Sequence, residues 1–192
     1  MKLKLILFIS LTFLLVACPS KEEDIYINLN SFNIQASCSN IENNLNDTII
    51  CNDVFKIHLD FGSSPIAQSA FFSTNVGVAY AAYEPIVYLQ NKVSKCTIVN
   101  TEEFNNHGKN TDISNQFELC IDNSNWINEQ SMVEGINESV KLQYENNVNP
   151  YLKLNSNSSI KYSGKFAVQL ELSDGTLFSD TTQYVLINST NQ

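Results

Sequence analysis

The strongest constraint on how this chain folds is an alternation of apolar and polar residues with a period of two. In each such run one set of alternate residues is apolar and the other set is polar. The runs cover residues 55–61, 140–145 and 166–172. Because successive side chains of a strand point to opposite faces of a sheet, each run predicts a strand with one buried face.

Turn residues separate these runs. Ser173-Asp174-Gly175-Thr176 follows one of them, and Asp-Gly between two apolar runs predicts a hairpin because glycine accepts a positive φ. The return strand is expected from Leu177 to Ile187. Residues 25–29 and 32–36 are both apolar at alternate positions but have opposite parity, so we expect a bulge near Asn30-Ser31.

Asparagine is abundant, with 26 residues. It clusters at Asn43-Asn44, Asn105-Asn106 and Asn146-Asn147, and these clusters predict turns because Asn tolerates left-handed backbone. Thr101 to Asn115 is expected to be the longest loop, and Glu129 to Glu134 and Asn137-Glu138 are each expected to form a turn at most. Short strands separated in this way predict an all-β fold, an antiparallel β-sandwich of immunoglobulin-like or transthyretin-like type.

The first residues predict export. Lys2 and Lys4 precede an apolar run of about a dozen residues, which is shorter than the roughly 20 that a membrane-spanning helix needs. A cationic start, a short apolar core and a small residue at the cut site are typical of a signal peptide. We therefore divide the chain into a signal peptide over 1–17, a tether over 18–24 and one domain over 25–190.

The end of this leader, Leu15-Val16-Ala17-Cys18, resembles the lipobox of bacterial lipoproteins. The resemblance implies cleavage between Ala17 and Cys18, a diacylglycerol on the Cys18 thiol and further acylation of the new amino terminus. Two or three acyl chains give stable anchoring where one does not. Lys21-Glu22-Glu23 is similar to a surface-export signal of Bacteroidota lipoproteins. The expected location is the cell envelope, at the surface or the periplasmic face of the outer membrane.

The balance of charge excludes one class of partner. The chain has 11 lysines, no arginine and 20 acidic residues. Loss of Lys2 and Lys4 with the leader leaves nine lysines and a net charge of −11. Such a chain lacks the cationic stripe that a nucleic-acid binder needs, and an anionic bilayer should repel it. Lipid is therefore expected to hold it at the membrane, with an unidentified protein or glycan as its partner.

Four further cysteines remain, an even number in an exported chain, which predicts disulfides. We expect neighbours to pair, Cys38 with Cys51 and Cys96 with Cys120, each bond contributing about 2–4 kcal/mol. No Cys-x-x-Cys pair occurs, so neither a redox site nor a metal site is expected.

Residues 61–83 contain no charge. Their aromatic residues predict a candidate binding patch, although packing in the core is favoured for such a run. The patch comprises Phe71, Phe72, Tyr80 and Tyr83.

Catalytic and cofactor motifs are missing from the sequence. No nucleophile elbow, zinc-protease helix or phosphate-binding glycine loop occurs, and no cofactor is expected. His58 is expected to be a solvated surface residue and His107 to lie at a loop tip.

These observations favour a lipid-anchored, non-catalytic binding module rather than an enzyme. Two alternatives stay open. One is a structural component of an envelope-spanning secretion apparatus, through similarity in size, lipobox and strand-rich body to the outer-membrane lipoprotein of type VI secretion. The other, ranked last, is a hydrolase acting on cell-wall or extracellular substrates.

Overall fold

The computed structural model of the chain describes residues 24–39, 47–66, 86–121, 131–155 and 160–189. Within these ranges the fold is mostly β-strand, as the alternating pattern predicts, with one α-helix and a short 3-10 helix, η1 (Ser114–Gln116). No helix in the described part of the chain is long and apolar enough to cross a membrane.

The largest sheet has five strands in the order β4-β1-β3-β7-β6. Its members are β1 (Ile25–Cys38), β3 (Phe55–Pro65), β4 (Val87–Leu89), β6 (Phe117–Ile121) and β7 (Pro150–Leu154). Neighbours pair antiparallel except β1 and β4, which run parallel. The predicted strand at 55–61 is confirmed as β3, and the predicted bulge is confirmed as a register shift between Leu29 and Ser31.

A long bent hairpin supplies the remaining layer. Its strands are β8 (Ile160–Gly164), β9 (Phe166–Leu172), β10 (Leu177–Thr181) and β11 (Tyr184–Ser189). One half adds β5 (Val93–Asn100) in the order β10-β9-β5, and the other adds β2 (Thr48–Cys51) in the order β2-β11-β8. The predicted turn is confirmed, with Gly175 at φ +85°.

The bend in this hairpin splits the predicted return strand in two. The Thr182 hydroxyl accepts a hydrogen bond from the Phe166 backbone at 3.0 Å, and the Thr182 N–H donates to the Phe166 carbonyl at 2.9 Å. Thr101 makes the matching pair of bonds with Lys165. These bonds satisfy the backbone where the chain leaves one three-stranded sheet for the other.

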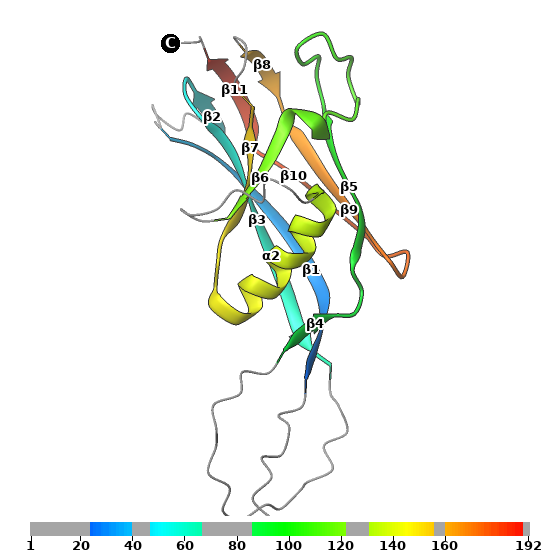
Figure 1. Ribbon diagram of the computed structural model, residues 1–192. Coiled ribbons are helices and arrows are strands. Elements are labelled where there is room, and N and C mark those ends of the chain that lie inside the picture. Colours follow the sequence, from blue (N-terminus) through cyan, green and yellow to red (C-terminus); the bar gives the residue numbers. More distant parts are fainter. Residues whose placement is uncertain (1–23, 40–46, 67–85, 122–130, 156–159, 190–192) are drawn as a thin grey trace, which may run out of the picture.

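Figure 1 shows the strands of both layers, and their buried side chains form one core. The Phe166 ring of β9 lies 5.4 Å from the ring of Phe55 in β3 and 5.5 Å from that of Phe117 in β6, between ring centroids. It also lies 4.5 Å from Tyr162 and 5.8 Å from Phe104. Residues of both layers therefore meet in one aromatic cluster.

The strand predicted at 140–145 is wrong, because these residues belong to the helix α2 (Met132–Asn146). The expectation of no more than a turn at 132–134 and 137–138 is wrong for the same reason. Ser131 caps the helix: its hydroxyl accepts from the Glu134 N–H, and the Glu134 carboxylate accepts from the Ser131 N–H. Ile136 and Val140 are buried and lie four residues apart on one helix face. Asn147 ends the helix in a left-handed conformation, which confirms the predicted turn there.

One predicted disulfide is confirmed and the other is wrong. Cys38 at the end of β1 is bonded to Cys51 at the end of β2, with 5.4 Å between their Cα atoms. Cys96 and Cys120 carry free thiols. Cys96 lies in β5 beside β9, whereas Cys120 lies in β6 beside β7, so the strands place them in different sheets.

Candidate functional site

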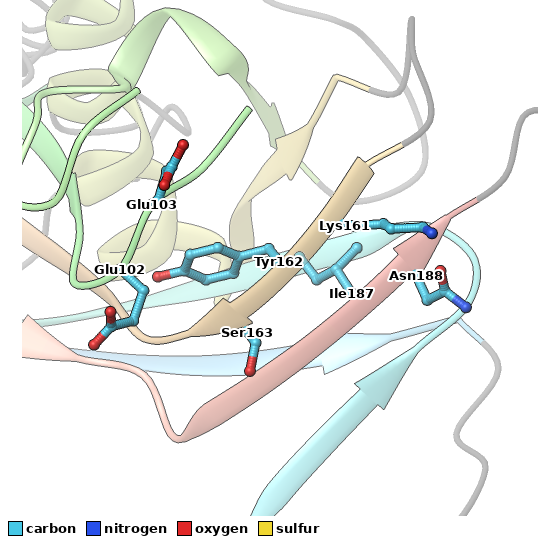
Figure 2. Close-up of a pocket in the computed structure, with 7 residues that line it drawn as sticks. All are labelled: Glu102, Glu103, Lys161, Tyr162, Ser163, Ile187 and Asn188. Carbon is cyan, nitrogen blue, oxygen red and sulfur yellow. The ribbon is translucent and has the colours of Figure 1, made fainter. Parts of the chain in front are cut away.

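A shallow, open hollow of about 480 Å³ lies beside β8, an edge strand among those that the structure describes (Figure 2). Three separate segments line it: the loop after β5, strand β8 and the end of β11. Its lining residues are Glu102, Glu103, Lys161, Tyr162, Ser163, Ile187 and Asn188.

The loop that carries the two glutamates is folded around Asn100, which is fully buried. The Asn100 amide donates to the carbonyls of Glu102 and Gly108, and its oxygen accepts from the Thr111 N–H at 3.0 Å. Three hydrogen bonds to one buried side chain fix the path of the loop. Glu102 and Glu103 are therefore presented to the hollow by a defined structure rather than by a loose loop.

A tight turn completes this loop. Asn105 and Asn106 have φ angles of 44° and 67°, as their sequence predicts, and Phe104 and His107 exchange two backbone hydrogen bonds across them. The Phe104 side chain is buried against Tyr162 with 5.3 Å between ring centroids. The turn is thus anchored to the core, and His107 lies at its base.

Tyr162 forms the floor of the hollow. Figure 2 shows its ring between Glu102 and Lys161. The hydroxyl donates to the Lys165 carbonyl, and burial raises the pKa of Tyr162 above its usual value. The hydroxyl is therefore protonated and engaged at neutral pH, so it contributes shape rather than acid–base chemistry.

The charges in the hollow are separated. Figure 2 shows Glu102 and Glu103 at one end and Lys161 with Asn188 at the other. Glu102 forms an ion pair with Lys109, which raises the pKa of that lysine. Ser163 shares a hydrogen bond of 2.7 Å with the Tyr184 hydroxyl. The lining offers hydrogen bonds and ionic contacts to a polar ligand.

A serine–histidine contact lies elsewhere, on the polar face of β1 and β3. The Ser37 hydroxyl and His58 Nε2 are 2.8 Å apart, and the His58 ring lies 5.8 Å from the Tyr151 ring. The prediction that His58 is a solvated surface residue is wrong, because the residue is half-buried and engaged by its neighbours. A hydroxyl within hydrogen-bond reach of an imidazole is the first requirement for a serine nucleophile.

The described side chains do not form a metal site. Among the residues whose positions the structure describes, no group of three or more His, Cys, Asp or Glu side chains is placed to hold a metal ion. The predicted lipidation and cleavage residues, Cys18 and Ala17, lie outside the described ranges, as does the predicted aromatic patch of Phe71, Phe72, Tyr80 and Tyr83.

Sequence reasoning did not find the hollow. Its lining comes from residues 102–103, 161–163 and 187–188, and only the pairing of β8 with β11 brings the last two segments together. Comparison with known proteins adds no assignment, since no family model, curated protein or solved structure matches this chain.

Proposed function

We propose that this protein is a lipid-anchored, non-catalytic binding module of the bacterial cell envelope, held at the outer membrane. The observation that carries the proposal is the tetrapeptide Leu15-Val16-Ala17-Cys18 behind a short apolar leader. The first strand, which begins at Ile25, supports it, because a tether of only 18–24 separates the acylated cysteine from the folded domain.

The partner is a polar molecule, either a protein surface or a glycan. The hollow supports this choice, because its lining combines carboxylates, an ammonium group, an amide and a hydroxyl. We assign the fold to the antiparallel β-sandwiches of immunoglobulin-like or transthyretin-like type. Two strand layers that share one aromatic core support that assignment.

A hydrolase is the second candidate, favoured by the 2.8 Å contact between Ser37 and His58. It predicts covalent labelling of Ser37 by a fluorophosphonate probe, lost in the Ser37→Ala variant. A wild-type protein that resists the probe while an authentic serine hydrolase reacts under the same conditions removes this candidate.

Detergent phase partitioning tests the anchoring. Wild-type protein expressed in a bacterium should enter the detergent phase and incorporate radiolabelled palmitate, whereas Cys18→Ala should stay in the aqueous phase unlabelled. Cys96→Ala is the matched control, since it removes a free thiol that the proposal leaves unmodified. Continued membrane association of Cys18→Ala, or an unmodified Cys18 thiol in the mass spectrum of the mature protein, contradicts the proposal.

A further inference from the structure

Three strand ends meet at one end of the molecule, which we call the anchor pole and define as residues 24–28, 63–66 and 86–89. The Ile25 N–H donates to the Ile86 carbonyl at 3.0 Å, and the Ile66 N–H donates to the Tyr26 carbonyl at 2.8 Å. Figure 1 shows β4 and the start of β1 at this end, and β2, β8 and β11 at the other.

The surface of the anchor pole is aromatic and nearly uncharged. The rings of Tyr26 and Tyr88 stack with 5.3 Å between their centroids. Tyr88 is 40% exposed and Ile86 is 47% exposed. Asp24 is the one charged residue within the pole as defined. Tyrosine beside exposed aliphatic residues is typical of protein surfaces at the membrane–water interface.

The length of the tether limits how far this pole can lie from lipid. Asp24 lies six positions after Cys18, and each step spans at most about 3.5 Å, so the reach is about 20 Å. A lipid on Cys18 therefore holds the start of β1 close to the bilayer.

The hollow lies at the opposite end of β1. This strand has 14 residues and, at about 3.3 Å per residue, spans about 45 Å. Its last residue, Cys38, is bonded to Cys51, and Cys51 pairs with Ile187 in the lining of the hollow. The anchor pole and the hollow therefore lie near opposite ends of β1, separated by most of the length of this strand.

We infer that the anchor pole rests in the headgroup region of the bilayer, with Tyr26, Tyr88 and Ile86 against lipid, and that the hollow is held at the distal end facing away from the membrane. The inference rests on the proposed lipid anchoring and adds an orientation to it. Charge supports it, because the rest of this strongly acidic chain is repelled by anionic lipid, whereas the pole is nearly neutral.

Fluorescence quenching by lipid tests the orientation. The mature lipidated protein is reconstituted in phosphatidylcholine vesicles with or without brominated acyl chains, and the wild-type emission of Trp126 is subtracted as the baseline. The Tyr88→Trp variant should lose at least half of its added emission. Tyr184→Trp is the matched control: the same substitution at equal exposure, 40%, three residues before Ile187 near the distal end. Its added emission should be unchanged.

A second measurement separates the test of orientation from the test of anchoring. Vesicle flotation is measured on the same samples and reports anchoring alone. Protein that floats but shows equal quenching of Tyr88→Trp and Tyr184→Trp, or none of either, overturns the orientation and leaves the anchoring intact. Protein that does not float overturns both. Ile86→Trp provides a second probe at the pole if Tyr88→Trp fails to fold, and it should be quenched in the same way.

Discussion

The carboxamide of Asn137 makes two hydrogen bonds to the backbone of Val93. Its oxygen accepts from the Val93 N–H at 2.8 Å, and its nitrogen donates to the Val93 carbonyl at 3.0 Å. Val93 begins β5, which is an edge strand among those the structure describes. A helix side chain therefore takes the place of a neighbouring strand and fixes α2 to the sheet.

Replacing this side chain should loosen the helix. Asn137→Ala should lower the free energy of unfolding by about 1–3 kcal/mol, because the backbone groups of buried Val93 lose their partners. Asn146→Ala, the same change at an exposed position of α2, should stay within about 0.5 kcal/mol of wild type. Urea unfolding followed by circular dichroism measures both, and equal midpoints for the two variants would contradict the assignment.

The same device occurs at the bulge in β1. The Asn91 oxygen accepts from the Leu29 N–H at 2.8 Å, and its nitrogen donates to the Leu29 carbonyl at 3.0 Å. With Asn100 in the loop after β5, three asparagines act as long-range or loop-closing partners of the backbone. The sequence pattern predicts turns at asparagine, which is correct for Asn105 and Asn106. It does not predict the role of Asn91 and Asn137, because their backbone partners lie 62 and 44 residues away in sequence.

Local patterns were sufficient where the structure itself is local. The alternation in β3 and β9, the hairpin at Gly175 and the parity change at Leu29 are each set by residues within a few positions. The helix was missed because Val140 and Tyr144 satisfy a period of two as well as a spacing of four. The Ser131–Glu134 capping box, which precedes an apolar face, was the sequence signal that favours the helix.

Long-range features could not be predicted in this way. Cys96 and Cys120 are equally close in sequence whether or not they pair, and only the strand order separates them into different sheets. The hollow depends on β8 pairing with β11 and on the loop around Asn100. The loop is local in sequence, but its approach to β8 and β11 is set only by the tertiary fold.

The number of free thiols can be counted directly by labelling with a maleimide. In the mature protein, denatured without reduction, two thiols should react with a maleimide, because Cys38 and Cys51 are bonded and Cys18 carries lipid in the proposed form. After reduction the count should rise to four. An initial count of zero, with a peptide linking Cys96 to Cys120 in the mass spectrum, would restore the pairing that the structure excludes.

Cys96 should make stability depend on pH in the alkaline range. Burial, with a smaller contribution from Asp112, raises the pKa of this thiol from 9.0 to about 12. Above pH 9 the unfolded chain releases the proton while the folded chain retains it, so the stabilising contribution falls as pH rises from 9 towards 12. The free energy of unfolding of wild type, measured in urea, should therefore fall more steeply above pH 9 than that of Cys96→Ala. If the free energies of unfolding of the two proteins change in parallel from pH 8 to 10.5, the raised pKa of Cys96 is refuted.

Gly164 should resist even a single added methyl group. An alanine Cβ there would lie 2.6 Å from the Tyr162 hydroxyl oxygen and 3.0 Å from the Glu102 side chain, so Tyr162 would have to leave the floor of the hollow. Gly164→Ala should cost about 1–3 kcal/mol of unfolding free energy. Gly108→Ala, whose Cβ meets nothing nearer than 3.8 Å, should be tolerated. The Cβ would also lie 2.8 Å from the ring carbon that carries this hydroxyl, so the whole ring must be removed to relieve the clash. Gly164→Ala/Tyr162→Leu should therefore recover at least about 0.5 kcal/mol relative to the sum of the single variants, measured by denaturant unfolding. Strict additivity would show that the two residues do not compete for this space.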